Sequence, residues 1–97
     1  MGDEELVEKW LRGTPDDAAD KVKRVLIKYF GDNFEDKHSG GSHQYRVKHP
    51  ALANLSGFGI GGHLSIPVKN GTKVKGCYLK RIAQAIKYLE EAQLGLD

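Results

Sequence analysis

The tetrapeptide Gly-Gly-Ser-His at residues 40–43 is the part of the sequence best suited to chemistry. Histidine changes its charge near neutral pH, so His43 could act as a general base or a general acid. The glycines favour a turn and let a substrate backbone approach closely. Ser42 could orient the imidazole or contact a phosphate. Alone the motif is weak evidence, because a histidine at a surface turn is the plainer interpretation. His43 also shares a predicted strand face with Tyr45 and Val47 and could be a packed residue.

Positive charge is concentrated around this motif. Residues 38–89 contain eight Lys or Arg and no Asp or Glu, although the whole chain of 97 residues has a net charge of only +2. Residues 1–37 hold seven basic and ten acidic residues. A segregated positive surface attracts polyanions through electrostatic steering and release of their counterions. The pattern therefore favours a polyanion partner over chance clustering of charges on a solvated face.

A metal site is the first alternative to consider, because the basic segment also contains every histidine of the chain: His38, His43, His49 and His63. Zinc usually takes three or four ligands from Cys, His or carboxylate, and Cys77 is the only cysteine. A magnesium nuclease needs carboxylates near the scissile phosphate, and the segment has none. We therefore expect metal-independent chemistry with no cofactor.

Several cations are candidates for phosphate contacts. Those between residues 73 and 81 cluster at the predicted N-terminus of a helix, where backbone N–H groups and the helix dipole also favour an anion. The plainer interpretation is a lysine-rich turn before an amphipathic helix. Two further cations on the strand of His43 could extend the surface. The full set is Arg46, Lys48, Lys73, Lys75, Lys80 and Arg81.

Hydrophobic spacing predicts the elements that must position these residues. Apolar residues three and four apart predict helices over residues 4–12 and 76–92, and a middle helix that starts at Thr14-Pro15 and ends at Gly31. Alternating patterns predict strands over residues 34–38, 42–49 and 63–68. The order α-α-β-β-β-α predicts an α+β fold, a two-layer sandwich in which helices cover one face of a three-stranded antiparallel sheet.

The chain as a whole is long enough for one domain with one modest core, residues 1–97. No stretch approaches the roughly 18 apolar residues of a membrane helix, and the acidic N-terminus is unlike a signal peptide. A single cysteine excludes a disulfide framework. We therefore expect a cytoplasmic protein without a membrane partner.

An ordered set of motifs resembles the HicA family of bacterial and archaeal toxins, which are mRNA interferases paired with HicB antitoxins. The motifs span roughly residues 20–89 and are Gly41-Ser42-His43-Gln44-Tyr45, Lys48-His49-Pro50, Leu64-Ser65-Ile66-Pro67-Val68, and Lys75-Gly76 leading into Leu79-Lys80-Arg81-Ile82. The resemblance implies a core like a double-stranded-RNA-binding domain, α-β-β-β-α, over about residues 16–92. It also implies that His43 is catalytic. The chain departs from the short family pattern by a helical extension over residues 1–13 and a long glycine-rich connection over residues 51–62.

These observations lead to the hypothesis of a metal-independent endoribonuclease that cleaves mRNA and pairs with a HicB-like antitoxin. RNA cleavage needs a base for the ribose 2′-OH, an acid for the leaving oxygen and positive groups for the developing charge. His43 would supply one proton-transfer group. The sequence does not identify the second, for which His49 and His63 are only candidates. A non-catalytic double-stranded-RNA-binding module is the alternative, because that fold binds RNA by shape without a histidine at the turn. A purely protein-binding role, in which the basic surface meets an acidic antitoxin, is a third possibility.

Overall fold

The computed structural model describes residues 2–54 and 62–92, so most of the glycine-rich connection predicted over residues 51–62 lies outside the described residues. The described elements, in chain order, are α1 (Asp3–Arg12), β1 (Asp16–Ala18), α2 (Ala19–Phe30), the 3-10 helix η1 (Gly31–Asn33), β2 (Phe34–Ser39), β3 (Ser42–Lys48), the 3-10 helix η2 (Pro50–Asn54), β4 (His63–Pro67), β5 (Lys73–Lys75) and α3 (Gly76–Ala92).

Strands β2, β3 and β4 form one antiparallel sheet in that order, with β3 in the centre. This confirms the predicted α+β fold with a three-stranded antiparallel sheet and an N-terminal helix. The hairpin between β2 and β3 turns at Gly40 and Gly41, whose φ angles are +52° and +86°. A two-residue hairpin turn with positive φ at both positions matches the twist of the flanking strands and strongly favours glycine. The turn therefore determines the pairing of β2 with β3.

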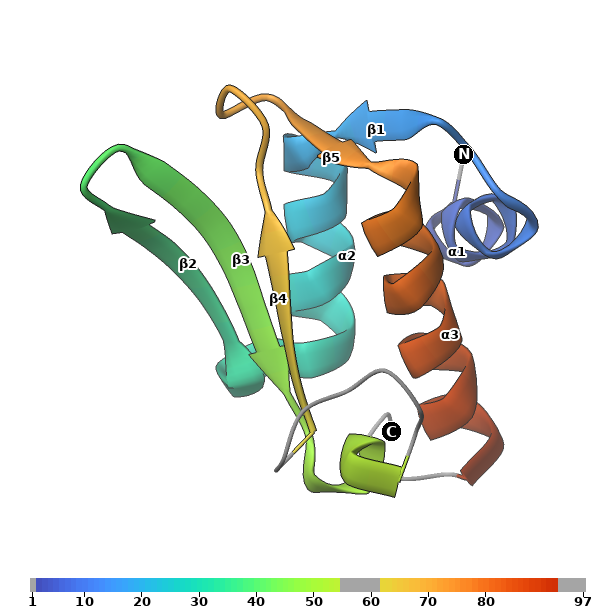
Figure 1. The fold of residues 1–97 in the computed structure, drawn as a ribbon. Coiled ribbons are helices and arrows are strands. Elements are labelled where there is room, and N and C mark those ends of the chain that lie inside the picture. The colour runs from blue at the N-terminus through green and yellow to red at the C-terminus, as the bar shows by residue number, and fades with distance from the viewer. Residues whose placement is uncertain (1, 55–61, 93–97) are drawn as a thin grey trace.

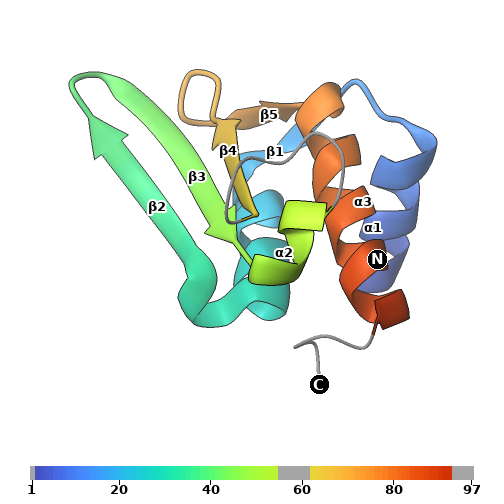
Figure 2. The same cartoon turned by 60° about the horizontal axis from the view of Figure 1, so that its bottom comes forward.

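The helices lie on one side of this sheet (Figures 1 and 2). Helix α2 contacts β2 and β3, whereas α1 packs against α3 rather than against the sheet. Alternate residues of β3 and β4 face the helices and are buried, as the alternating pattern predicted: Tyr45, Val47, Leu64 and Ile66. These side chains join apolar side chains from all three helices in one hydrophobic cluster. Among the described residues, no helix is long and apolar enough to cross a membrane.

The predicted start of the middle helix was wrong. Helix α2 begins at Ala19, and residues Asp16–Ala18 form strand β1, which pairs antiparallel with β5. The carboxylate of Asp17 accepts a hydrogen bond of 3.0 Å from the indole Nε1 of Trp10 in α1. Proline and acidic residues are local signals for a helix start, but strand β5 is distant in sequence and gives this segment a tertiary pairing partner.

The ribbon formed by β1 and β5 ends at Gly76, the first residue of α3. The N–H of Gly76 donates to the carbonyl oxygen of Pro15 at 2.7 Å. A Cβ atom at this position would lie 1.8 Å from the carbonyl oxygen of Thr14. Only glycine therefore allows the start of α3 to approach the segment before β1 so closely.

Replacing Gly76 with alanine tests this constraint. The added methyl group would force the start of α3 away from Thr14, and overpacking of this kind typically costs about 1–3 kcal/mol. We expect the Gly76→Ala variant to lose this much free energy of unfolding in a urea titration. Gln84→Ala, an exposed substitution in the same helix, is the control and should stay within about 0.5 kcal/mol of the wild type. Equal stability of the two variants would contradict the close approach.

Candidate functional site

His43 lies on the helix-facing side of the sheet, next to the hairpin turn. Its side chain is 19% exposed and its ring meets the ring of Tyr45 edge-on, with centroids 5.3 Å apart. The hydroxyl of Tyr45 donates to the carbonyl oxygen of Ala19 at 3.3 Å, which joins β3 to the start of α2. Burial, followed by the charges of Asp36 and Asp20, raises the pKa of Tyr45, so this hydroxyl stays protonated and can donate. His43 is thus held on a rigid scaffold.

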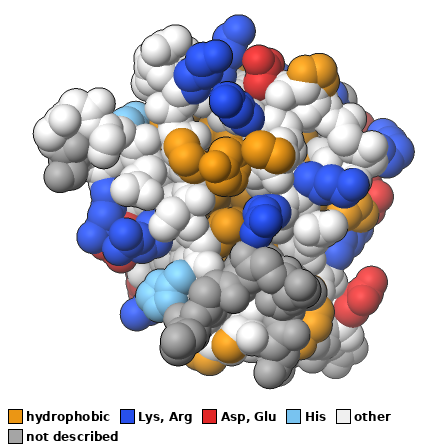
Figure 3. Space-filling model, viewed as in Figure 1, with side chains coloured by type: hydrophobic (Ala, Val, Ile, Leu, Met, Phe, Trp, Pro, Cys, Tyr) orange, Lys and Arg blue, Asp and Glu red, His pale blue; other side chains and the backbone are white. Residues whose placement is uncertain are grey.

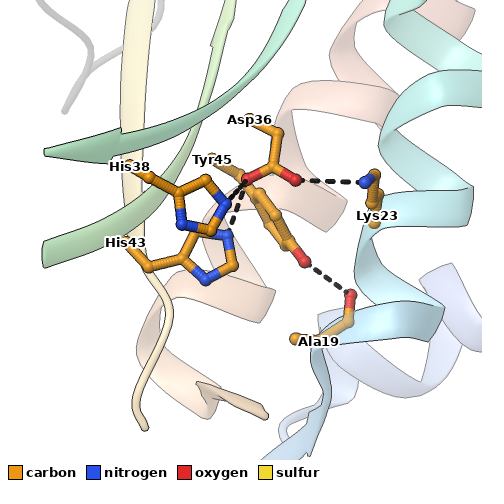
Figure 4. Close-up of polar contacts among 6 residues, drawn as sticks. All are labelled: Ala19, Lys23, Asp36, His38, His43 and Tyr45. Atoms are coloured by element: carbon orange, nitrogen blue, oxygen red, sulfur yellow. Dashed lines mark hydrogen bonds and ion pairs between the residues drawn. The ribbon is translucent and has the colours of Figure 1, made fainter. Parts of the chain in front are cut away.

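The pairing of β2 with β3 brings two further polar side chains to His43. His38 is directly opposite His43 in the sheet, and Asp36 is opposite Tyr45. Because side chains alternate along a strand, Asp36, His38 and His43 all share the helix-facing side. Figure 4 shows the three side chains converging. Nε2 of His43 lies 2.6 Å from Oδ1 of Asp36, and Nε2 of His38 lies 3.4 Å from the same oxygen.

Lys23 of α2 also contacts the carboxylate of Asp36. Its Nζ atom lies 3.0 Å from Oδ2, the oxygen that the histidines do not share. Burial of Asp36 opposes ionisation, but hydrogen bonds from Lys23 and His43 outweigh it and hold the pKa of Asp36 below its ordinary value. An ionised carboxylate can only accept hydrogen bonds. Nε2 of His43 is therefore the donor, and in the neutral ring Nδ1 carries the lone pair.

This arrangement can transfer protons. Nδ1 of His43 has no hydrogen-bond partner among the described residues, so it is available as a base, while Asp36 holds the ring in one orientation and tautomer. The ring of His38 stacks on that of His43, with centroids 3.9 Å apart and an angle of 19° between the planes. The side chain of His38 is 67% exposed. Two imidazoles at one place can supply both the base and the acid of a hydrolytic or transesterification step.

The other predicted catalytic candidates are not brought to this place. Ser42 precedes His43 on the strand, so its side chain lies on the opposite face of the sheet, and Asp36 rather than Ser42 orients the imidazole. His49 is six residues along from His43, about 20 Å away at the rise of a strand. His63 pairs with Lys48 at that same far end of the sheet. His49 and His63 are therefore too distant to act with His43 on one phosphate.

The predicted cations lie at three separate places. Arg46 and Lys48 alternate with Tyr45 and Val47, so they lie on the face of the sheet away from the helices and away from the His43 side chain. Arg81 is exposed on α3. The remaining three line a surface hollow at the start of α3, which we call the lysine hollow; its lining is Gly13, Thr14, Pro15, Asp16, Lys69, Lys73, Lys75, Gly76, Cys77 and Lys80.

The lysine hollow and the hairpin turn lie toward the same end of the molecule, and the connection between β4 and β5 lies between them in both ribbon views (Figures 1 and 2). The backbone connects them directly, because the N–H of Val68 donates to the carbonyl oxygen of His43 at 3.0 Å and Val68 is followed by Lys69. Figure 3 shows several lysine or arginine side chains at the top of this view, near β5 and the connection between β4 and β5, and others at its left and right edges. A polyanion in the lysine hollow could therefore extend toward the histidines.

Comparisons of the chain with protein-family models, with curated proteins and with solved structures gave no match. The case for a function therefore depends on the geometry of the site.

Sequence reasoning missed the partners of His43. It judged carboxylates absent because residues 38–89 contain none, but Asp36 lies only two residues before that segment and reaches His43 across the hairpin. The Gly-Gly turn was the available signal, because a two-residue turn pairs residue 38 with residue 43 and places residue 36 on the same face. Lys23, which comes from α2, had no such signal.

The role of Asp36 can be tested without any assumption about function. Asp36→Asn removes the negative acceptor that holds the proton of His43 on Nε2. We expect the wild type to show the Nε2–H tautomer of His43 in nitrogen-15 NMR spectra of the ring, and the variant to lose this preference. Glu35→Gln changes an exposed carboxylate on the opposite face and is the control. An unchanged tautomer in Asp36→Asn would contradict the orienting role.

Proposed function

We propose that the protein is a metal-independent endoribonuclease that cleaves mRNA by proton transfer from histidine. The observation that carries the proposal is the 2.6 Å contact between Asp36 and His43, with His38 stacked on the same ring. Cleavage of RNA by its own 2′-hydroxyl needs a base, an acid and stabilisation of charge on the phosphate, and needs no cofactor. The resemblance to HicA toxins supports the same reaction and the same histidine.

In the proposed reaction, Nδ1 of His43 takes the proton from a ribose 2′-hydroxyl. The freed oxygen attacks the adjacent phosphorus, the bond from phosphorus to the 5′-oxygen breaks, and that oxygen receives a proton from His38. Asp36 stays ionised and stabilises the charged form of His43. His38 replaces His49 and His63 as the candidate for the second proton-transfer group, because it alone of the three lies beside His43.

The lysine hollow supplies the proposed contacts with the RNA backbone. Lys73 and Lys75 flank the buried Val74 on β5, so their exposed side chains lie on the same side of the ribbon. Lys69 and Lys80 border the same hollow. Backbone contacts of this kind position RNA without reading its sequence. The non-catalytic alternative, a double-stranded-RNA-binding module, would use the same hollow but would not require the histidines.

The resemblance extends the proposal to the biological setting. A HicB-like antitoxin would be the protein partner, and mRNA in the cytoplasm would be the substrate. The basic surface around the lysine hollow is chemically suited to either an RNA backbone or an acidic face of an antitoxin.

Cleavage of labelled RNA in the presence of EDTA tests the proposal. We expect the wild type to cleave, and His43→Ala, His43→Gln and His38→Ala to lose about 10²–10⁴-fold in rate, the usual contribution of a positioned acid or base. His63→Ala should cleave like the wild type, because this residue lies at the far end of the sheet. Circular dichroism should confirm that every variant is folded.

The outcomes distinguish the alternatives. A gel shift in which the RNA stays intact would favour the non-catalytic binding module over the ribonuclease. Loss of cleavage in His63→Ala but not in His38→Ala would assign the second proton-transfer role to His63 instead of His38. Expression in cells adds an independent readout, because equal toxicity of the wild type and His43→Ala would contradict the assignment of His43.

Salt dependence tests the lysine hollow. If Lys73 and Lys75 each neutralise one phosphate, Lys73→Ala/Lys75→Ala should weaken binding to single-stranded RNA and reduce the slope of log K against log salt by about 0.7 per lost contact. Lys28→Ala, on the exposed side of α2, should leave the slope unchanged. A larger effect from Arg46→Ala/Lys48→Ala would instead place the RNA on the outer face of the sheet.

A further inference from the structure

The three side chains at the hairpin are also a set of metal ligands. One ligand atom from each of Asp36, His38 and His43 lies within 4.8 Å of the other two. Two imidazoles and one carboxylate, with positions left open for water, suit zinc and other divalent first-row transition metals. Magnesium prefers an octahedral shell of oxygen atoms, which this group does not provide.

We propose that Asp36, His38 and His43 together bind one divalent transition metal ion, with zinc as the probe, and that the bound ion blocks the proton-transfer role of His43. The first part stands on the geometry alone. The second part rests on the proposed ribonuclease function.

The distances already approach those of a coordinated ion. With metal–ligand bonds of about 2.0–2.1 Å and tetrahedral angles, neighbouring ligand atoms lie about 3.3 Å apart. The two histidine Nε2 atoms lie 2.6 Å and 3.4 Å from Oδ1 of Asp36. A small opening of the His43 contact would therefore make room for the ion. The hairpin holds the ligands, because His38 and His43 are paired residues and Asp36 is two residues away on the same strand face.

The surroundings favour one-oxygen coordination by Asp36. Nζ of Lys23 lies 3.0 Å from Oδ2 of Asp36, so Oδ1 is the oxygen left for the ion. The contact with Lys23 also fixes the orientation of the carboxylate, as hydrogen bonds to metal-binding carboxylates commonly do. The strongly exposed ring of His38 leaves the site open to solvent on its side. An ion could therefore enter without unfolding the hairpin, and water could fill the remaining coordination position.

Metal binding and base catalysis need opposite tautomers of His43. Without metal, Nε2 carries the ring proton toward Asp36 and Nδ1 holds the lone pair. With metal on Nε2, the lone pair must be on Nε2, so the single proton of the neutral ring moves to Nδ1. The nitrogen that would accept the proton of the 2′-hydroxyl is then occupied. The same three residues would thus serve either the ion or the reaction.

Titration of the purified full-length protein with zinc chloride, followed by calorimetry and by NMR of the histidine rings, tests the site. We expect one zinc ion per chain and ring shifts confined to His38 and His43. His38→Ala, His43→Ala and Asp36→Asn should each weaken binding more than about tenfold. His63→Ala and Cys77→Ser should bind like the wild type, because these exposed residues lie outside the group. His38 is exposed enough that its replacement should not disturb the fold.

Absence of saturable binding by the wild type would overturn the site, and so would wild-type affinity in His38→Ala or loss of binding in Cys77→Ser. RNA cleavage measured in the same samples separates this proposal from the proposed function. Cleavage by the metal-free protein, after EDTA has been removed, that stops with one equivalent of zinc supports both. If the protein binds zinc but cleaves no RNA with or without the ion, the metal site is supported and the ribonuclease function is contradicted. Cleavage only with zinc keeps the site and overturns both its inhibitory role and the metal-independent mechanism.

Discussion

The pairing register of the β2–β3 hairpin is the constraint on which the site depends. Two glycines with positive φ form the turn, and the pairs Ser39–Ser42 and His38–His43 follow directly from it. A shift of one residue would move every side chain of one strand to the other face. The burial of Tyr45 and Val47 against the helices prevents such a shift. The packing of the core therefore also maintains the contact between Asp36 and His43.

A second constraint shapes the cationic part of the molecule. The short ribbon of β1 and β5 joins the N-terminal segment to the start of α3, and the contact between Gly76 and Pro15 closes it. The ribbon gives Lys73 and Lys75 an extended backbone, so their side chains spread over one surface instead of following a helix. The hydrogen bond from Trp10 to Asp17 then ties α1 to the same region. Lys73 and Lys75 thereby line the same hollow as Lys69 and Lys80.

The chemistry of the site comes from one carboxylate oxygen shared by two imidazoles. Such an oxygen can orient a base, and it can equally complete a set of metal ligands, because both roles use the same lone pairs. Lys23 favours the first role by adding positive charge beside Asp36, and it leaves the second role possible by binding only the other oxygen. Whether Nε2 of His43 carries a proton or binds a metal ion therefore depends on four side chains. They are Asp36 and His38 of β2, His43 of β3 and Lys23 of α2.

Local patterns in the sequence were sufficient to predict much of this protein. They indicated the bounds of α1 and α3 and of the three sheet strands to within about two residues, the glycine turn, the helix-facing side of β3 and the acid-free segment around His43. Periodicity and turn preference act between near neighbours, so they are visible without a fold. Tertiary structure alone turned the predicted start of the second helix into strand β1. It also placed Lys23 beside Asp36, because packing between the helix layer and the sheet depends on the whole core.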